Sequence, residues 1–335
     1  MPASASTPDL FATLQASTPS IRSTPQVTQP ISTLDISLST VTPSSNSSGP
    51  TSIPSPSAAD SPSGHIVFTC QVFKDQGTEQ ICLMNADGSG YRRLTTEDKI
   101  RHFYPSLSPN GKTVLYSAFV AQNNYDVYRL DLTTGVADRL SSLQGMDDAP
   151  EYSPDGDSIV YMHNSITKNT YEIFIMDHNG GNGGNISGIN GWDPTWSPDG
   201  SAILFASDKS GSVQLYTIKL DGTQLHRITD LPSIRGRSDW SSDGKYIVTY
   251  SGDSWKRELF IMNADGSGVH QLSPSGGNSQ GPSFSPDGKW VAFTAYFDHP
   301  NDDNGCEIYI IRIDGTGLRR LTNNDYCDYQ PRWGP

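Results

Sequence analysis

The sequence predicts an all-β fold, a six-bladed β-propeller of four-stranded blades, from three observations. A Ser-Pro-Asp-Gly turn or a close variant begins at residues 108, 153, 197, 241 and 285, which are 45 or 44 residues apart. Two β-rich runs and a closing Leu-Thr or variant follow each turn, and the C-terminal residues repeat only the start of this unit. Four short strands in every unit of about 40–45 residues are typical of propeller blades.

Residues 1–63 differ sharply in composition from the rest of the chain. More than half of them are Ser, Thr or Pro, and Phe11 is their one aromatic residue. Such a segment buries too little apolar surface to offset its chain entropy, and proline keeps it extended. We therefore expect a disordered segment, either a stalk that holds the propeller away from a cell surface or a linker to an upstream domain or membrane anchor. The predicted propeller spans residues 64–335.

Each predicted blade contains two runs rich in β-branched and aromatic residues, which favour strands. The first run covers residues 66–70, 113–117, 158–162, 202–206, 246–250 and 290–294. The second run covers residues 80–84, 126–130, 172–176, 214–218, 258–262 and 307–311. Turns such as residues 85–88 and 263–266 come next, where Gly adopts positive φ easily. A short strand that ends in Leu94-Thr95 or Leu321-Thr322 closes the unit.

One large side chain recurs immediately before the turn of each unit. These residues are Leu107, Tyr152, Trp196, Trp240, Phe284 and Trp333. We interpret this column as the packing layer between neighbouring blades, with a row of ligand-binding aromatics as the alternative. The chain enters the ring at residues 66–70, the second strand of the first blade, and ends on a lone first strand at residues 329–333. We expect the last strand to complete the first blade, which leaves no open sheet edge.

These repeats resemble the TolB-like propeller family, whose units run Pro-x-Trp-Ser-Pro-Asp-Gly, a β run, Glu-Ile-Tyr-x-Met-Asn-Ala-Asp-Gly and Leu-Thr. Residues 194–200 and 258–266 carry the motifs here, and the resemblance covers residues 64–335. It implies a six-bladed, mostly extracytoplasmic propeller that commonly serves as a protein-interaction scaffold. The chain departs from TolB in lacking the small α/β domain before the propeller, so partners specific to TolB are not carried over. Similar repeats form the gating propeller of prolyl oligopeptidase-type enzymes, where a hydrolase domain follows.

The net charge of −13 argues against a nucleic-acid partner. Binding a polyanion requires a clustered basic face, which the sequence does not show. No run approaches the roughly 20 apolar residues that span a bilayer. The N-terminus also lacks the basic and then apolar pattern of a signal peptide. We expect no direct insertion of this chain into a membrane.

The four cysteines lie in the first and last predicted blades. Cys70 and Cys82 fall opposite each other on two strands of one hairpin, and Cys306 and Cys327 lie at one end of the last blade. We expect two local disulfides, Cys70 with Cys82 and Cys306 with Cys327. Metal binding is the rival interpretation, although neither C-x-x-C nor Cys/His clustering is present. Disulfides indicate an oxidising compartment, hence a secreted, cell-surface or periplasmic protein.

The segment Gly277-Asn-Ser-Gln-Gly281 matches the G-x-S-x-G pattern of serine hydrolases. A nucleophile elbow needs a strand, a strained turn and a helix. Here Pro282 and a short strand follow instead, so we interpret Ser279 as a loop serine and assign no catalytic residue.

The predicted loops divide the propeller into two faces. The short Ser-Pro-Asp-Gly and Ala-Asp-Gly turns share one face, the turn face, and the more variable loops form the other, the loop face. We expect ligand binding on the loop face, at the mouth of the ring. Aromatic residues beside charged groups there suit a protein, peptide or glycan, and capping of the blade ends is the alternative. The candidates are Tyr104, Asp148, Trp192, Asp193, Arg235, Arg237, Trp255, Asp328 and Tyr329.

An acidic insertion at residues 297–305 offers the hard oxygen ligands that calcium takes. Its candidate ligands are Asp298, Asp302 and Asp303. The spacing does not fit an EF-hand, because Pro300 and Ile311 occupy ligand positions. A solvated acidic loop is the alternative, and we expect no required cofactor.

The predicted fold and candidate residues are compatible with three functions. The leading hypothesis is an extracytoplasmic binding propeller on a flexible stalk. The rival is a propeller enzyme, a lyase or a glycan-active enzyme, that uses Asp148, Asp193 and His102. The third is a structural component of a surface assembly.

Overall fold

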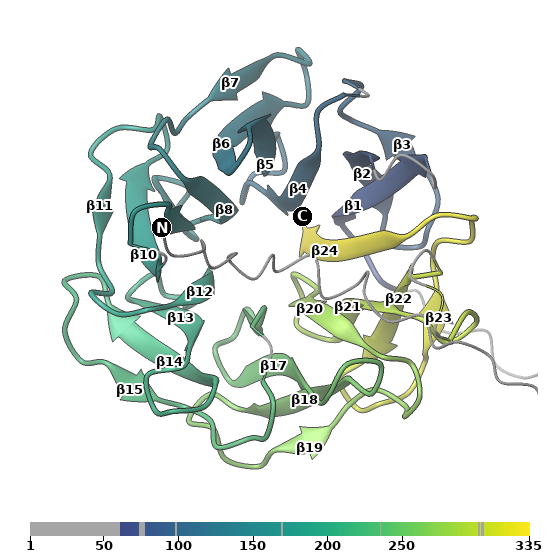
Figure 1. The fold of residues 1–335 in the computed structure, drawn as a ribbon. Helices are drawn as coiled ribbons and strands as arrows, with labels where there is room; N and C mark the ends of the chain where they lie inside the picture. The colour runs from purple at the N-terminus through teal and green to yellow at the C-terminus, as the bar shows by residue number, and fades with distance from the viewer. Residues whose placement is uncertain are drawn as a thin grey trace, which may run out of the picture. The chain divides into compact units, whose positions relative to one another are not determined.

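The computed structural model describes residues 61–335, except residues 74–77, 98, 169, 235, 301, 303 and 304. The secondary structure of these residues consists of strands, and they contain no helix. Consequently, no membrane-spanning helix occurs among them. The strands form sheets that surround a common centre (Figure 1). Almost all of the predicted stalk, residues 1–63, lies outside the described residues.

Four sheets contain four strands each, and every pairing within them is antiparallel. The first sheet has the order β24 (Asp328–Gly334), β1 (His65–Phe73), β2 (Thr78–Asn85) and β3 (Arg92–Arg93). The second has β12 (Trp192–Trp196), β13 (Ala202–Ser207), β14 (Gln214–Lys219) and β15 (His226–Arg227). The third has β16 (Asp239–Trp240), β17 (Tyr246–Ser251), β18 (Glu258–Asn263) and β19 (His270–Gln271). The fourth has β20 (Gln280–Phe284), β21 (Trp290–Ala295), β22 (Glu307–Arg312) and β23 (Arg319–Arg320).

The remaining strands form one larger sheet. It contains β4 (His102–Leu107), β5 (Thr113–Ala121), β6 (Asn124–Asp131), β7 (Ala137–Arg139), β8 (Met146–Tyr152), β9 (Ser158–Ser165), β10 (Thr170–Asp177) and β11 (Gly184–Asn185). A single parallel bridge between Tyr125 and Met146 joins β6 to β8. The prediction of six separate four-stranded sheets therefore requires correction, because this bridge merges eight strands into one sheet.

The innermost strands form a closed series around the centre. Each contacts the next in the order β24, β4, β8, β12, β16, β20 and again β24 (Figure 1). The predicted closure by the C-terminal strand is confirmed, because β24 pairs with β1 in a register that places Trp333 opposite Ile66. The two ends of the described chain therefore share one sheet.

The column of large side chains packs between neighbouring sheets, as the sequence predicts. Trp333 lies in a cluster with Ile66 of its own sheet and Trp290 of the preceding sheet. Phe284 likewise contacts a cluster that includes Val248 of the sheet before it. Burying aromatic surface in this way is a major source of stability in such a fold.

The Ser-Pro-Asp-Gly turns are closed by side-chain hydrogen bonds. Ser285 Oγ donates to Asp287 Oδ1 at 2.6 Å and accepts from the Trp290 amide at 2.9 Å. Asp287 Oδ1 also accepts from the Lys289 amide at 3.1 Å. Ser and Asp side chains thus satisfy turn amides that have no strand partner, which explains why these residues recur.

Five of the innermost strands carry a bulge immediately before a proline. The residue that precedes the proline has φ near +50° in each of them. These residues are Tyr104, Ala149, Asp193, Gly281 and Gln330. A bulge adds one residue to a strand and redirects the local side chains. In β16 and the residues just before it, Ser238 replaces the proline, and Gly236 has φ of 129° instead.

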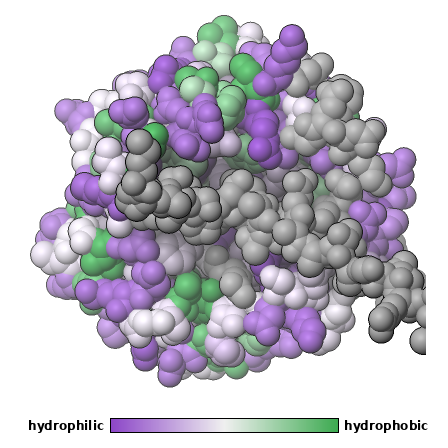
Figure 2. Space-filling model, in the orientation of Figure 1, coloured by the Kyte–Doolittle hydropathy of each residue, from purple (hydrophilic) through white to green (hydrophobic). Residues whose placement is uncertain are grey.

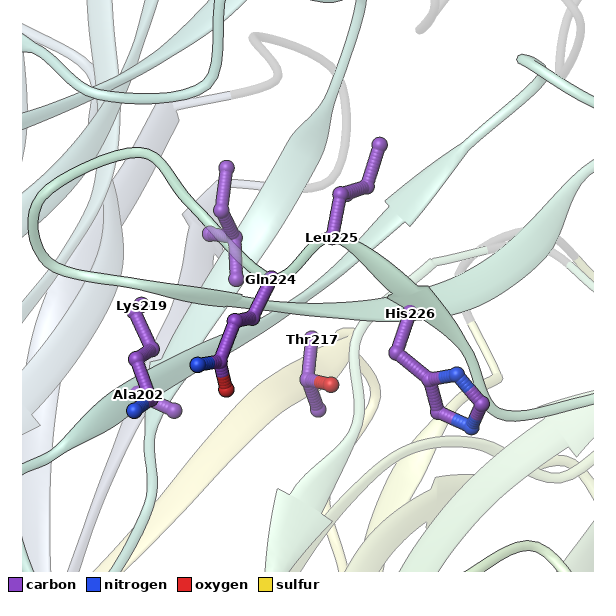
Figure 3. Close-up of a pocket in the computed structure, with 7 residues that line it drawn as sticks. Ala202, Thr217, Lys219, Gln224, Leu225 and His226 are labelled. Atoms are coloured by element: carbon purple, nitrogen blue, oxygen red, sulfur yellow. The ribbon is translucent and has the colours of Figure 1, made fainter.

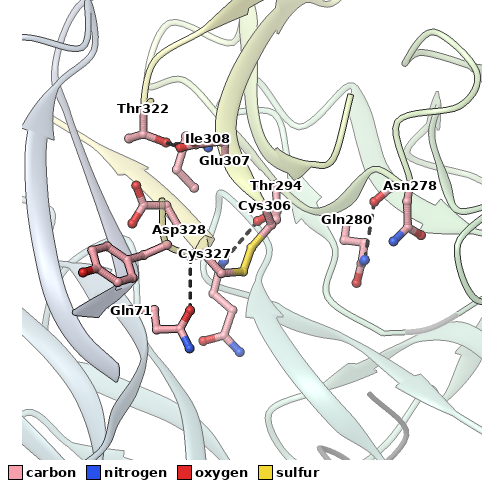
Figure 4. The surroundings of a disulfide bond; sticks show 12 residues. Gln71, Asn278, Gln280, Thr294, Cys306, Glu307, Ile308, Thr322, Cys327 and Asp328 are labelled. Atoms are coloured by element: carbon pink, nitrogen blue, oxygen red, sulfur yellow. Dashed lines mark hydrogen bonds between the residues drawn. A yellow bond between two sulfur atoms is a disulfide. The ribbon is translucent and has the colours of Figure 1, made fainter. Parts of the chain in front are cut away.

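Both predicted disulfides are present. Cys70 and Cys82 join β1 to β2 with a Cα–Cα distance of 5.8 Å. Cys306 and Cys327 join the segment before β22 to the segment before β24 with a Cα–Cα distance of 4.5 Å. The surroundings of the second bridge include Gln71, whose Oε1 accepts from the Cys327 amide at 3.3 Å (Figure 4). The two bridges reinforce the sheets on either side of the ring closure.

The ring closure predicts that a substitution in the closing strand destabilises the protein far more than a substitution at an exposed position. Trp333→Ala should lower the free energy of unfolding by about 3–5 kcal/mol, because it leaves a cavity where two sheets meet. Urea denaturation followed by circular dichroism measures the change. Val136→Ala is the control, since Val136 is 57% exposed and its loss should change stability by less than about 0.5 kcal/mol. Equal denaturation midpoints for the two variants would contradict the closure.

Candidate functional site

Charged side chains from several sheets meet at the centre of the ring. Each comes from an innermost strand or from the residues just before one. We call this group the central cluster, and its members are Tyr104, Asp148, Glu151, Asp193, Arg237, Asp239 and Arg332. Four of them belong to the predicted loop-face candidates.

Arg332 of β24 is the charge-paired arginine of the central cluster. Its Nη2 lies 2.9 Å from Glu151 Oε2 of β8, and its Nη1 lies 3.3 Å from Asp239 Oδ2 of β16. Thr195 Oγ1 of β12 donates to the other oxygen of Glu151 at 2.7 Å. Arg332 is 7% exposed and its two carboxylate partners are half-buried, so this network links three innermost strands through charges largely shielded from water. Removing one partner of such a pair would leave an uncompensated buried charge.

Arg237 reaches across the ring to β4. Its guanidinium carbon lies 5.4 Å from the centroid of the Tyr104 ring, and its Nη2 donates to the Pro105 carbonyl at 3.4 Å. The Arg237 amide donates to Asp193 Oδ2 at 3.1 Å. Gly236 permits this approach, since a Cβ at that position would lie 2.2 Å from Asp193 Oδ2. Gly236 also has φ of 129°, a backbone conformation that other residues rarely adopt, so glycine is favoured before Arg237.

Burial changes the acid–base properties of the central cluster. Burial raises the pKa of Asp148 to about 7, with further raising effects from Asp147 and Asp193. It also raises the pKa of Asp193, although Arg237 opposes this shift. Burial lowers the pKa of Arg237 to about 10, and the nearby Arg332 lowers it further. The cluster therefore combines a positive charge with one carboxyl group, that of Asp148, whose pKa lies near neutral pH.

The central cluster contains several buried polar atoms without a hydrogen-bond partner. They are Asp193 Oδ1, Arg237 Nε, Arg237 Nη1 and Arg332 Nε. Buried polar groups in native proteins are nearly always hydrogen-bonded, so each exception requires an explanation. Donors and acceptors that converge from different sheets are suited to binding a polar group of a ligand.

The two tryptophans among the candidates pack against other side chains. Trp192 packs against a hydrophobic cluster and meets the Tyr171 ring edge-on at a centroid distance of 6.5 Å. Trp255 meets the Tyr296 ring at 5.1 Å and, with Tyr329, borders the second disulfide. Packing thus accounts for both tryptophans, although neither belongs to the packing column that the repeat predicts.

The remaining candidates do not join the central cluster in the described contacts. Asp328 is fully buried, and its Oδ2 accepts from Asn324 Nδ2 at 2.8 Å. Burial raises the pKa of Asp328 to about 7. Arg235 lies outside the described residues. The ligand-binding role of each candidate stays a prediction.

Within the acidic insertion, the described contacts include two made by Asp298. Asp298 Oδ2 accepts from Tyr309 Oη at 2.6 Å and pairs with Arg320 Nη1 at 2.7 Å. Both contacts involve Oδ2 of Asp298. The described residues contain no group of three or more His, Cys, Asp or Glu arranged to hold a metal ion. Asp303 lies outside the residues that the structure describes.

Ser279 and His102 do not belong to the central cluster, whereas Asp148 and Asp193 do. Ser279 is fully buried, and its amide donates to the Arg257 carbonyl at 2.7 Å. His102 contacts Glu97 at 3.5 Å and the Tyr116 ring at 5.3 Å. Burial lowers the pKa of His102 to about 4, so this imidazole is neutral at physiological pH.

A separate surface pocket of about 430 Å³ lies on the sheet β12–β15. Figure 3 shows Thr217, Gln224 and His226 pointing toward the same side of this sheet. The residues lining the pocket come from β13, β14, β15 and the turn before β15, and they include no loop-face candidate.

Three members of the central cluster, Glu151, Asp239 and Arg332, are absent from the predicted candidates. A signal for them exists, because each stands immediately before a member of the packing column. Side chains alternate between the two faces of a strand, so the residue before each packed aromatic points away from that packing layer. The complete set at this position is Ser106, Glu151, Thr195, Asp239, Ser283 and Arg332.

The raised pKa of Asp328 predicts a pH-dependent stability. The folded protein holds a proton on Asp328 that the unfolded chain releases, so stability should fall as pH rises from about 4 to about 7. Asp328→Asn removes this contribution. The free energy of unfolding of the variant, relative to that of the wild type, should therefore be higher at pH 8 than at pH 5 by roughly 1–4 kcal/mol. Urea denaturation at both pH values measures it, with the exposed Asp325→Asn as control. Identical pH dependence in Asp328→Asn and the wild type would contradict the prediction.

Known proteins with similar sequences match only parts of the chain. An uncharacterised protein of Agrobacterium fabrum, Atu1656, is 28% identical over 165 residues, which is 46% of this chain and 55% of that protein. Dipeptidyl-peptidase 5 of Porphyromonas gingivalis is 38% identical over 140 residues, which is 37% of this chain and 20% of that enzyme. The aligned regions thus span about half or less of these relatives.

A solved structure and a family model both match most of the described chain. The crystal structure of TolB from Acinetobacter baumannii superposes with a TM-score of 0.71 at 25% identity, covering 81% of this chain and 67% of that one. The model of the TolB beta propeller domain matches residues 63–335. The chain therefore belongs to the TolB beta propeller domain family.

Proposed function

We propose that this chain is an extracytoplasmic binding propeller whose central cluster recognises a protein or peptide at the loop face. The observation that carries the proposal is the convergence of Tyr104, Asp193 and Arg237 from three different sheets. Their buried polar atoms without partners are the kind of preorganised groups that fix a ligand's orientation. A glycan remains the alternative ligand.

The surface around the ring favours recognition through polar groups. Figure 2 shows that hydrophilic residues cover most of the described surface on the face in view, with hydrophobic residues in small separate groups. Recognition without a broad apolar patch depends on a few well-placed polar and aromatic side chains. The central cluster contains both kinds.

The proposal includes six blades, a location and a stalk. We count the eight-stranded sheet as two blades because one bridge joins its halves, whereas each half has four antiparallel strands. The residues just before β20 and β18 are also joined by one backbone hydrogen bond, which the Ser279 amide donates to the Arg257 carbonyl. The sheets of β18 and β20 nevertheless count as two separate sheets. The two disulfides support an oxidising, extracytoplasmic location. Residues 1–63 would act as the flexible stalk.

A second candidate function rests on Asp148. A carboxyl group with a pKa of about 7 beside other charged groups is suited to general acid–base chemistry. A lyase or glycan-active enzyme is therefore the alternative. Peptidase activity is not carried over from Dipeptidyl-peptidase 5, because this chain aligns with 20% of that protein.

The proposed function predicts which substitutions abolish binding. The full chain would be screened against a displayed peptide library and a glycan array, and the captured ligands would be tested with Arg237→Met and Asp193→Asn. Each variant should weaken binding by roughly 5- to 150-fold, the range of hot-spot residues at 1–3 kcal/mol. Lys289→Ala is the control, because Lys289 lies in a turn on the opposite face.

Two results would overturn this proposal. One is unchanged binding in both central-cluster variants while Lys289→Ala loses it, which would move the site to the turn face. The other is turnover of a captured ligand that Asp148→Asn abolishes, which would establish the enzyme instead. Melting temperatures of all variants would show whether each remains folded.

A further inference from the structure

We propose that the ligand presents a carboxylate to the centre of the ring, carried by an Asp or Glu side chain of a peptide segment, and that Arg237 is its counter-charge. This inference rests on the proposed function and specifies the chemical group that the site recognises. It starts from the Arg237 guanidinium, for which no ion pair is found among the described residues, whereas the neighbouring Arg332 forms two.

Arg237 is a buried cation without an ion-pair partner. It is 6% exposed, and among the described residues no carboxylate pairs with its guanidinium. Its Nη2 makes one long bond of 3.4 Å to a carbonyl, and its Nε and Nη1 have no partner. Arginine does not lose its proton in proteins, so a buried guanidinium requires a counter-charge or hydrogen bonds.

The other charges of the central cluster are already engaged. Arg332 pairs with both Glu151 and Asp239. Asp239 Oδ2 also accepts from the Phe284 amide at 2.8 Å. Arg237 is thus the arginine of the cluster whose guanidinium forms no ion pair among the described residues, although Asp193 attracts it electrostatically.

Among the groups that face Arg237, Asp148 favours a carboxylate, whereas Asp193 is a competing acceptor. Tyr104 of β4 lies against the guanidinium, and Asp193 of β12 accepts from the Arg237 amide. Asp148 of β8 carries a carboxyl that is protonated in part near neutral pH, since burial raises its pKa to about 7. A protonated carboxyl donates a hydrogen bond, which a ligand carboxylate accepts. Glu151 and Arg332 complete the charged surroundings and largely offset each other.

The aromatic residues favour a peptide over an acidic sugar. Sugar rings commonly stack on an open aromatic face. The Tyr104 ring is instead covered by Arg237, and Trp192 and Trp255 pack edge-on against other rings. A slender Asp or Glu side chain needs no such platform. An arginine binds it with charge-assisted hydrogen bonds, which are stronger than neutral ones.

The first experiment uses acetate as the simplest carboxylate probe. The full chain would be titrated with ¹³C-labelled sodium acetate against sodium chloride at equal ionic strength, and binding would be read from the acetate line width. We expect saturable broadening in the wild type, its loss in Arg237→Met and partial retention in Arg237→Lys. Arg227→Met is the matched control, since Arg227 is an exposed arginine on β15. Its Nη2 lies 3.7 Å from Asp230 Oδ1.

The second experiment identifies the source of the carboxylate. Amidated pentapeptides Gly-Gly-Glu-Gly-Gly and Gly-Gly-Gln-Gly-Gly would be compared with a free-acid pentaglycine and with glucuronate. The Glu peptide should bind at least about tenfold more tightly than the Gln peptide. This preference should disappear in Arg237→Met and persist in Arg227→Met.

The outcomes separate this inference from the proposed function. Equal binding of the Glu and Gln peptides, or no acetate binding by the wild type, overturns the carboxylate assignment even if the library screen yields ligands. Binding of glucuronate without binding of the Glu peptide replaces the peptide with a glycan. Another outcome is a library screen that yields no ligand although acetate binds and this binding requires Arg237. That combination would overturn the proposed protein or peptide partner but leave the carboxylate site in place.

Discussion

The pairing of β24 with β1 is the constraint on which the remaining structure depends. The N-terminal end of the ring supplies only β1, β2 and β3 of the first sheet, and the C-terminal β24 supplies its innermost strand. Without β24, the inner edge of this sheet would be unpaired. Trp333 supplies the apolar contact of this pairing, and the register places it opposite Ile66. Sequence positions about 270 residues apart thus become neighbours, and this long-range contact brings both ends of the repeat together.

The same strand also organises the centre of the ring. Arg332 precedes Trp333 and points away from its packing layer, so the closing strand carries an aromatic toward the neighbouring sheet and a cation toward Glu151 and Asp239. Fold and site are therefore coupled through consecutive residues. The position of Arg237 has a different local origin, because Gly236 and Ser238 replace the bulge and proline found in the other innermost strands.

Repetition made most of the fold predictable, whereas the site depends on exceptions to the repeat. The turns, strands, packing column and closure all follow from residues that recur at constant spacing. The Tyr125–Met146 bridge did not follow, because one backbone contact leaves no side-chain signature. Tyr104, Asp148, Asp193 and Arg237 are candidates because the sequence predicts variable loops there, whereas the structure places the first three on β4, β8 and β12. Arg332 was missed because its role depends on distances across the ring. The packing of Trp192 against other side chains cannot be read from its position outside the packing column.

The second disulfide has a further consequence for the closing strand. Cys327 immediately precedes β24 and is bonded to Cys306 of the adjacent sheet, so the strand remains covalently anchored at its start when its hydrogen bonds to β1 break. Its pairing residues, from Asp328 to Gly334, then stay within a few residues of the anchor. Re-pairing with β1 then starts from a strand whose first residue is held beside the adjacent sheet. The bridge thus limits how far the closing strand can move from the ring when its pairing with β1 opens.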